Sequence, residues 1–243
     1  MPFTFSHPAI ILPLKLLKQS WFSLTGLIIG SLTPDFEYFI RMKVQSDYSH
    51  TIGGIFLFDL PLGILLAFLF HNVIRNTLYD NLPWILKSRI IEFKQFNWTK
   101  YFRENWIVVI ISILIGAISH IFWDSFTHST GYFVELIPQL KYSINLAGKE
   151  IYIYKILQHT SSLIGGIIIA GSIYRLPKNT LINESLNLNY WIILTILVLV
   201  VMSIKLLISD NIQIGNLIVS VISAIIIGLI LTPLIFVNKN NAS

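Results

Sequence analysis

The stretch YWIILTILVLVVMSIKLLI, residues 190–208, decides the fold class of this chain. It holds one charged side chain, Lys205, within a run dominated by Ile, Leu and Val. A helix needs about 20 mainly apolar residues to cross the hydrocarbon layer of a bilayer, and a soluble domain rarely exposes so large an apolar surface. The segment therefore predicts a membrane-spanning helix.

Four other segments have the same character, and the composition of the chain agrees with them. Of its 243 residues 54% are hydrophobic and only 12% are charged, with a mean hydropathy of +0.71. A soluble domain carries about 25% charged residues. The five predicted spans are Ile52–Ile74, Trp106–Trp123, Leu157–Tyr174, Tyr190–Ile208 and Gly215–Val237. We expect an all-α, polytopic integral membrane helical bundle.

The apolar stretch Ala9–Leu32 differs from these spans because Lys15 and Lys18 lie near its middle. A charge at the centre of a spanning helix costs about 2.5–3.5 kcal/mol. We therefore predict shorter N-terminal helices, packed on the bundle or lying at the interface. Gly26 and Gly30, four residues apart, would permit close contact with another helix.

We expect two domains, a membrane-embedded domain with a metal site over residues 1–175 and a C-terminal transmembrane helical hairpin over residues 176–243. The chain has no cysteine, so any metal site must use His, Asp, Glu or backbone ligands. The net charge of +5 comes from residues scattered over loops, which suits anionic lipid headgroups and not nucleic acid. The expected partners are membrane lipids.

Ionisable residues gather at one predicted membrane face. With five crossings, the N-terminal segment, the end of the second span and the start of the third span share that face, and only His71 falls opposite. Ionisable groups at membrane depth are costly and usually functional. The residues on the shared face are His7, Asp35, Glu37, His50, His120, Asp124, His128 and His159.

The segment SHIFWDSFTH, residues 119–128, carries the most specific pattern. His120 and Asp124 are four residues apart, so a helix would place both on one face, and His128 follows one turn later. Two imidazoles and a carboxylate are a common zinc ligand set. The alternative is a helix end in which His120 donates to Asp124 and His128 faces water. Both interpretations are open at this level.

Asp35 is open to two readings that can hold together. Thr33 and Pro34 precede it, as at an ordinary helix start, and a carboxylate in the first turn suits that position. Asp35 is equally a candidate metal ligand, and Glu37 is a weaker one. His50 alone would be a loop histidine, and His159 begins a helix.

Asp59 lies inside the first span, two residues before Pro61, which leaves backbone groups without helical partners. We expect Asp59 to cap that break or to accept a hydrogen bond from a metal-ligating histidine in the second shell. His71, near the far interface, is expected to be solvated.

Four blocks of the chain resemble an uncharacterised bacterial integral-membrane family, a domain of unknown function. They are MPFTFSHPA (residues 1–9), GSLTPDFEY (30–38), SHIFWDSFTH (119–128) and LQHTSS (157–162). The pattern is also similar to the YdjM-type inner-membrane proteins, described as metal-dependent hydrolases. More distantly, it resembles the zinc-dependent phospholipase C and P1 nuclease group, in which zinc ions cleave phosphoesters.

The resemblance implies His120, Asp124 and His128 as metal ligands, with Asp35, His50 and His159 as further ones. The phospholipase pattern continues its last ligand as His-x-x-x-Glu, but Leu163 stands four residues after His159, so one or two ions are expected and not three.

The function expected from these features is metal-dependent hydrolysis of a phosphoester of a lipid headgroup, at the surface of the bacterial inner membrane. One or two divalent ions, expected to be zinc, would activate water. His7 would complete the ligand shell, and Asp35 or Glu37 would serve as general base. The alternatives are an ion- or proton-coupled transporter and a non-catalytic membrane scaffold.

Overall fold

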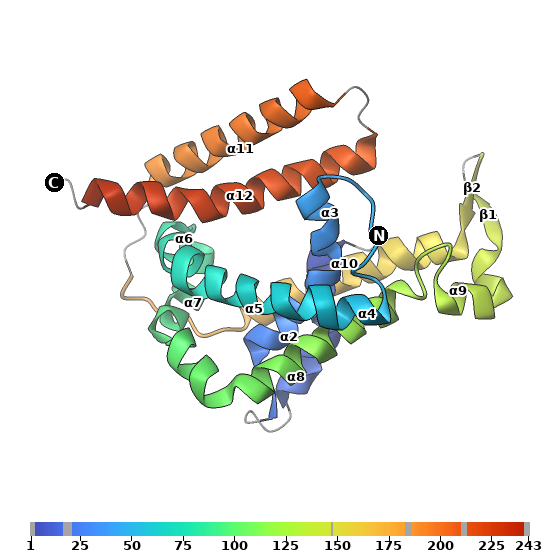
Figure 1. Ribbon diagram of the computed structural model, residues 1–243, viewed down its shortest axis with the longest axis horizontal. Coiled ribbons are helices and arrows are strands. Elements are labelled where there is room, and N and C mark those ends of the chain that lie inside the picture. The colour runs from blue at the N-terminus through green and yellow to red at the C-terminus, as the bar shows by residue number, and fades with distance from the viewer. Residues whose placement is uncertain (1–2, 17–20, 147, 183–185, 210–212, 241–243) are drawn as a thin grey trace. The chain divides into compact units, whose positions relative to one another are not determined.

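The computed structural model describes residues 3–16, 21–146, 148–182, 186–209 and 213–240. Nearly all of its regular structure is helical, and the one sheet is the hairpin of β1 (Ser143–Leu146) and β2 (Lys149–Tyr152) (Figure 1). The all-α fold class is thereby confirmed. Lys18, on which the shorter N-terminal helices were partly predicted, lies outside the described residues.

Five described helices are long and apolar enough to cross a membrane: Ile52–Asn81, α8 (Trp98–Asp124), α10 (Ile153–Tyr174), α11 (Leu188–Ile208) and the part of α12 (Ile214–Asn240) from Ile214 to Phe236. The number of predicted spans is confirmed, and the chain is a multi-pass membrane protein. The second helix begins at Trp98, eight residues before the predicted start of its span at Trp106. The backbone departs from helical geometry at Asn105, which kinks this helix between its polar first turns and its apolar length.

The first spanning helix contains two wider π-helical stretches. It runs through α4 (Ile52–Gly54), a π-helical stretch Ile55–Asp59, α5 (Leu60–Leu69), a second π-helical stretch Phe70–Ile74 and α6 (Arg75–Asn81). Pro61 has no N–H to donate to the preceding turn, and the first π-helical stretch lies directly before it. The irregularity expected near Asp59 therefore exists.

The N-terminal segment forms short helices, as predicted. They are a 3₁₀ turn at Thr4–Ser6, α1 (Pro8–Ile11), a second 3₁₀ turn at Leu12–Leu16 and α2 (Leu24–Gly30). The Ser23 side chain caps α2 by accepting a hydrogen bond from the Gly26 N–H. A further 3₁₀ turn, Thr33–Asp35, leads into α3 (Phe36–Arg41).

The chain forms two compact units, and each is discontinuous in sequence. Unit 1 comprises Met1–Asp35, Tyr48–Ile64 and Asn105–Ser172, and unit 2 comprises Phe36–Asp47, Leu65–Glu104 and Ile173–Ser243. The predicted division after residue 175 stays a prediction.

Unit 1 is built on a close approach of α2 to α8. A Cβ atom on Gly30 would lie 2.1 Å from the carbonyl oxygen of Ile113, and one on Gly116 would lie 2.4 Å from that of Leu27. Only hydrogen at these two positions allows the backbones to come so near. The close helix contact predicted from Gly26 and Gly30 is confirmed, because a Cβ on Gly26 would also lie 2.8 Å from Ser112. Buried Leu27, Ile113 and Ala117 fill the core beside this contact.

Unit 1 also holds the connection from α8 to α10. It contains α9 (Tyr132–Leu136), a 3₁₀ turn at Pro138–Lys141 and the β-hairpin, whose strands pair Ile144 with Ile151. Gly148 in the hairpin turn has a φ of +79°, a conformation that glycine adopts without strain. Because α8 ends and α10 begins at this connection, the end of α8 and the start of α10 lie at the same membrane face.

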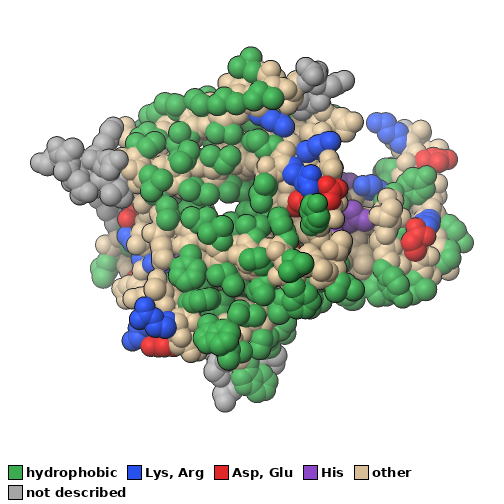
Figure 2. Space-filling view, viewed as in Figure 1, with side chains coloured by type: hydrophobic (Ala, Val, Ile, Leu, Met, Phe, Trp, Pro, Cys, Tyr) green, Lys and Arg blue, Asp and Glu red, His purple; other side chains and the backbone are tan. Residues whose placement is uncertain are grey.

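Unit 2 contains α3, α6, α7 (Trp84–Ile90) and the pair α11 and α12, which lie side by side (Figure 1). Ser223 of α12 donates a 2.7 Å hydrogen bond to the Phe39 carbonyl at the end of α3. Arg75 is buried and donates to the carbonyl oxygens of Phe96 and Lys94. Hydrophobic side chains are spread widely over the face shown in Figure 2, as expected where lipid is the solvent.

Candidate metal centre

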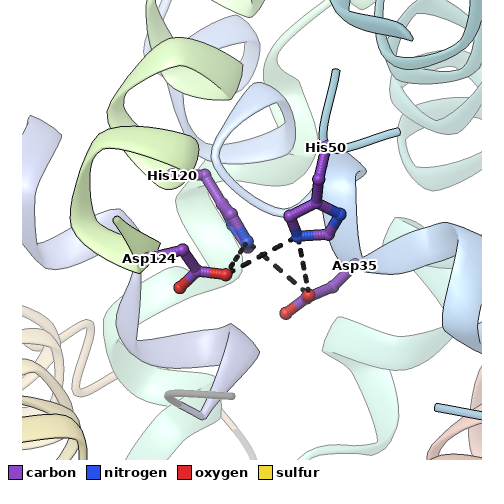
Figure 3. A group of neighbouring side chains, drawn as sticks. All are labelled: Asp35, His50, His120 and Asp124. Carbon is purple, nitrogen blue, oxygen red and sulfur yellow. Dashed lines mark ion pairs between the residues drawn. The ribbon is translucent and has the colours of Figure 1, made fainter. Parts of the chain in front are cut away.

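Four side chains of unit 1 converge from three separate segments (Figure 3). Asp35 ends the 3₁₀ turn that follows α2, and His50 lies in the turn before α4. His120 and Asp124 lie one helical turn apart at the end of α8, where the i, i+4 spacing directs both to the same side. We call these four residues the Asp/His cluster.

The potential ligand atoms of the Asp/His cluster surround one point. His120 Nε2 lies 3.4 Å from Asp124 Oδ2 and 3.6 Å from Asp35 Oδ1. His50 Nε2 lies 3.6 Å from the same oxygen of Asp124 and 3.8 Å from the same oxygen of Asp35. All four atoms lie within 4.8 Å of one another.

These separations match a coordination sphere. Imidazole and carboxylate ligands bind zinc at about 2.0–2.1 Å in a tetrahedral arrangement, which makes the ligand-to-ligand edge about 3.3–3.4 Å. The four measured separations, 3.4, 3.6, 3.6 and 3.8 Å, are slightly longer than that edge. A small inward movement of the side chains would therefore complete the sphere, and the residues present fit a divalent ion.

Three of the ligand atoms are buried polar atoms without a hydrogen bond. In the part of the chain that the structure describes, Asp35 Oδ1, His120 Nε2 and Asp124 Oδ2 have no hydrogen-bond partner. Asp35 and His120 are fully buried, and Asp124 is 5% exposed. Buried polar groups are nearly always hydrogen-bonded, and leaving one unsatisfied costs about 1–3 kcal/mol. Three such atoms aimed at one point indicate a site for a cation.

Backbone and hydroxyl contacts fix the tautomers of the two histidines. His120 Nδ1 lies 2.7 Å from the Ser31 carbonyl oxygen, which can only accept, so Nδ1 carries a proton, and in the neutral ring Nε2 then has the lone pair. The Ser49 hydroxyl donates to the Pro34 carbonyl at 2.6 Å and faces His50 Nδ1 at 3.0 Å. Its proton is therefore committed, and His50 Nδ1 is the donor. Both rings present Nε2 to the cluster, as metal-ligating histidines do.

Each carboxylate is held through the oxygen that faces away from the cluster. The Thr4 hydroxyl donates to Asp35 Oδ2 at 2.5 Å, and His7 Nε2 lies 3.1 Å from Asp124 Oδ1. The other oxygen of each carboxylate is the one aimed inward. The N-terminal turn therefore orients both acids.

His7 is fully buried, and its ring stacks on His120 with centroids 3.7 Å apart. Burial is the main cause that lowers the pKa of His7 to about 3, so the ring is neutral at physiological pH. A neutral ring has one N–H, and the contact of Nε2 with Asp124 is shorter than the 3.3 Å contact of Nδ1 with the Thr4 carbonyl. We therefore assign the proton to Nε2, which donates to Asp124.

His128 lies next to the cluster but outside the group of four. Its Nδ1 is 3.1 Å from the Asp124 carbonyl oxygen and 3.6 Å from Asp124 Oδ2. Its side chain is 29% exposed, and that of His50 is 22% exposed, whereas Asp35 and His120 are inaccessible. Burial lowers the pKa of His128. The edge formed by His50 and His128 is therefore the open side of the cluster.

The remaining predicted site residues are placed elsewhere. His159 is exposed on α10, where its neighbour Gln158 faces inward instead. Glu37 is buried in unit 2, where its carboxylate pairs with Arg41 and accepts from Ser46 and from the Asp47 N–H. Asp59 is fully buried on the π-helical stretch of the first spanning helix, outside the group of four.

His71, expected to be solvated, is instead buried at 7% exposure in unit 2. Its ring stacks on Trp98 with centroids 4.8 Å apart, and its Nδ1 lies 3.0 Å from Arg75 Nη1. The expectation failed because both partners come from long-range packing that its position near a span end does not reveal.

Sequence reasoning did not identify Thr4, Ser31 or Ser49 as parts of the site. Ser49 directly precedes His50, and Thr4 lies one 3₁₀ turn before His7, so a search for hydroxyls beside candidate ligands would have found both. Ser31 contributes its backbone carbonyl, for which no side-chain signal exists.

No curated protein and no solved structure matches the chain. Residues 1–234 match a family described as "Domain of unknown function (DUF4184)". That match covers the N-terminal helices, the Asp/His cluster and all but the last residues of the fifth span. The chain therefore belongs to this family of unknown function, DUF4184.

Proposed function

We propose that this protein is a membrane-embedded, metal-dependent hydrolase that cleaves a phosphoester of a lipid headgroup. The observation that carries the proposal is the Asp/His cluster, with four potential ligand atoms within 4.8 Å of one another. Asp124 lies at the end of a spanning helix, so the cluster belongs at the depth of the phospholipid headgroups.

The donor set favours zinc and one ion. Two imidazoles and two carboxylates suit zinc, whereas calcium and magnesium prefer oxygen ligands alone. With neutral imidazoles the cluster carries two negative charges, which a divalent cation balances. A carboxylate that has a second free oxygen can bridge two ions, but the outer oxygens of Asp35 and Asp124 are engaged by Thr4 and His7.

The exposed edge of the cluster is what favours catalysis over a purely structural role. Structural zinc sites are closed by four protein ligands, whereas catalytic ones keep a position open or expand to five ligands, so an ion held by all four side chains here would take water or substrate as a fifth ligand. His50 and His128 line an edge that solvent reaches, with 22% and 29% of their side chains exposed. A phosphoester and a water molecule can approach from that edge.

When bound, a divalent ion supplies Lewis-acid polarisation of the phosphoryl oxygen and lowers the pKa of water. The chain's own residues hold the geometry, since Thr4 and His7 fix the carboxylates while Ser31 and Ser49 fix the imidazoles. Hydrolysis forms one P–O bond to water oxygen and breaks the ester P–O bond, and the leaving alcohol takes a proton from water. Of the two residues expected as general base, Glu37 has its carboxylate engaged in unit 2, and Asp35 has its outer oxygen bonded to Thr4 and its inner oxygen aimed at the cluster.

The resemblance of residues 119–128 to YdjM-type membrane hydrolases and, distantly, to zinc-dependent phospholipases supports the reaction class and a bacterial inner-membrane location. One fold or motif serves many substrates, so the substrate is a separate question from the reaction class. The phosphoester therefore has to be tested directly.

The test compares detergent-purified wild type with His120→Ala, Asp124→Asn and the control His159→Ala. Metal content is measured by plasma mass spectrometry, and hydrolysis is followed with bis(p-nitrophenyl) phosphate and with phosphatidylglycerol in mixed micelles. We expect about one zinc per chain and hydrolysis in the wild type and the control, and loss of both in the two cluster variants. EDTA should abolish hydrolysis and zinc should restore it.

Two results would overturn the proposal. Stoichiometric metal retained in both cluster variants would show that these residues are not the ligands. Bound metal that lowers stability when removed, without hydrolysis of either substrate, would indicate a structural ion in a scaffold.

A further inference from the structure

An apolar groove lies beside the Asp/His cluster in unit 1. It has a volume of about 400 Å³, within the range of about 300–1,000 Å³ that is usual for ligand sites. Its walls come from α1, the end of α8 and α10, and they include Ile10, Phe122, Phe126, Leu157, Ile164 and Ile168. Thr127 and Ser161 are the only hydroxyl-bearing residues among the described lining residues.

The groove and the cluster share elements and neighbouring residues. Trp123, directly before Asp124, lines the groove, and its ring packs edge-on against His7 at 5.3 Å. Ala9, two residues after His7, forms part of the opposite wall. The buried His7 therefore lies between this wall and the Asp/His cluster, and Thr127, which also lines the groove, directly precedes His128 at the open edge of the cluster.

Gly165 lines the groove at a position where there is no room for a side chain. A Cβ on Gly165 would lie 2.9 Å from the Ser6 carbonyl oxygen and 3.4 Å from the Trp123 ring. The missing side chain lets the N-terminal turn and Trp123 pack directly on α10. The hydrogen bond from Trp123 Nε1 to Ser161 Oγ, 3.1 Å, satisfies the indole and leaves its carbon face to the groove.

The groove follows α10 from the membrane surface into the bilayer. Its lining runs from Leu157, one turn after α10 begins, to Ile168, and eleven residues of helix rise about 16 Å. Ile164 and Ile168 are 57% and 44% exposed on a helix that is apolar enough to span a membrane. The open side of the groove therefore faces the hydrocarbon layer of the membrane.

A lysine lies near the start of α10, although it is not among the residues that line the groove. Lys155 lies in the first turn of α10, and its Nζ donates to the buried Gln158 Oε1 at 2.9 Å. An ammonium group there complements a lipid phosphate. An apolar trough that faces the bilayer and a metal-ligand cluster near its surface end match the order of acyl chain and phosphate in a phospholipid.

We propose that the groove binds one acyl chain of a membrane phospholipid and thereby positions the phosphate of that lipid at the Asp/His cluster. The proposal rests on the proposed function, because it names the substrate class of that site. The substrate would be recognised by its chain within the bilayer and by its phosphate at the surface.

The test uses a matched pair of substitutions on neighbouring residues of α10. Ile164→Trp places a large ring in the groove, whereas Leu163→Trp adds the same ring at a 67% exposed position that does not line it. Both side chains face lipid, so both variants should fold and insert. The probe is phosphatidylglycerol with a diazirine at the end of one acyl chain, in phosphatidylcholine vesicles that contain the full chain.

We expect photolysis to label peptides of the groove walls, and excess unlabelled phosphatidylglycerol to suppress that labelling. Ile164→Trp should lower the groove labelling about tenfold, and Leu163→Trp should leave it within twofold of wild type. Labelling that is equal on the groove and on α11, and that excess lipid does not suppress, would overturn the proposal. Labelling that is unchanged in Ile164→Trp would overturn it as well.

Activity separates failure of the groove from failure of the reaction. In Ile164→Trp we expect kcat/KM for long-chain phosphatidylglycerol to fall about tenfold, with no change for bis(p-nitrophenyl) phosphate, which has no acyl chain. Equal rates for all three proteins on both substrates would refute the groove and leave the hydrolase intact. Saturable labelling of the groove without any hydrolysis would refute the hydrolase and leave a lipid-binding groove.

Discussion

Removal of the His7 side chain tests whether this residue positions a metal ligand or is itself a metal ligand. His7 lies outside the Asp/His cluster, with Nε2 3.1 Å from the outer oxygen of Asp124 and its ring stacked on His120. In His7→Ala all four ligands remain, but Asp124 Oδ1 loses its donor in a buried setting. We expect zinc to bind more weakly at an unchanged stoichiometry of one ion.

The size of the effect follows from that single contact. A buried oxygen that loses its hydrogen bond costs about 1–3 kcal/mol, and a tenfold change in affinity corresponds to about 1.4 kcal/mol. Loss of an outer-shell partner commonly weakens metal binding about 10- to 100-fold, or about 1.4–2.8 kcal/mol. The two ranges overlap, so we expect the dissociation constant for zinc to rise 10- to 100-fold in His7→Ala. A glutamine retains an N–H donor, and His7→Gln should recover part of the loss.

The assay is competition for Zn²⁺ between detergent-purified protein and a fluorescent chelator, with His120→Ala and His159→Ala as the two limits. His120→Ala removes a ligand and should lose binding at zinc concentrations that saturate His7→Ala. His159→Ala should match wild type within twofold. The reasoning is refuted if His7→Ala binds zinc within twofold of wild type, because Asp124 would then need no support. If His7→Ala instead failed to bind one zinc ion per chain at saturating zinc, His7 would be a metal ligand and not a residue that supports Asp124.

Two further predictions concern the frame around the site. Gly30→Ala would place a Cβ 2.1 Å from the Ile113 carbonyl oxygen, so we expect it to lower the free energy of unfolding by about 1–3 kcal/mol or more and to weaken zinc binding. The control Gly166→Ala, with open space around it, should change neither the stability nor the zinc binding. Thermal unfolding in detergent with and without zinc checks this prediction, and equal melting temperatures for the two variants would contradict it. Glu37→Gln loses the charge that pairs with Arg41, so we expect lower thermal stability, full zinc content and unchanged hydrolysis of bis(p-nitrophenyl) phosphate. A large fall in kcat would instead identify Glu37 as a general base.

The spans were predictable because their signal is local. Each needs only a window of apolar residues, and the five windows found in the sequence correspond to five helices in the structure. The start of α8 was not predictable in this way, since its first turns, from Trp98 to Asn105, are polar and their helicity depends on packing. His120 and Asp124 were likewise predictable as a pair, because i, i+4 spacing on one helix places them together without any long-range contact.

The spacing of small and polar residues along α10 indicates which face of this helix packs on protein. Gln158, Ser161, Ser162 and Gly165 recur at the i, i+3, i+4, i+7 spacing of one helix face. In the structure that face meets the N-terminal turn, where the Phe3 N–H donates to Ser162 Oγ and Ser6 Oγ donates to the Ser162 carbonyl. Small and polar residues on an otherwise apolar helix mark the side that packs on protein, and His159 lies off that side. The period alone would have placed His159 away from Asp124.

The charge balance of unit 1 gives the strongest physical reason for a cation at the cluster. Asp35 and Asp124 are buried, and among the described residues their only ion-pair partners are histidines, with no Lys or Arg side chain beside either acid. Two buried carboxylates 3.4–3.8 Å from the same imidazole nitrogens would repel each other and would each bear a desolvation cost of several kcal/mol. Replacing buried ion pairs with apolar residues of similar volume often costs no stability, so buried acids are weak evidence for a purely structural role. Each acid is held by its outer oxygen so that the inner one points to a common centre, and a divalent cation at that centre would offset the charge of both carboxylates.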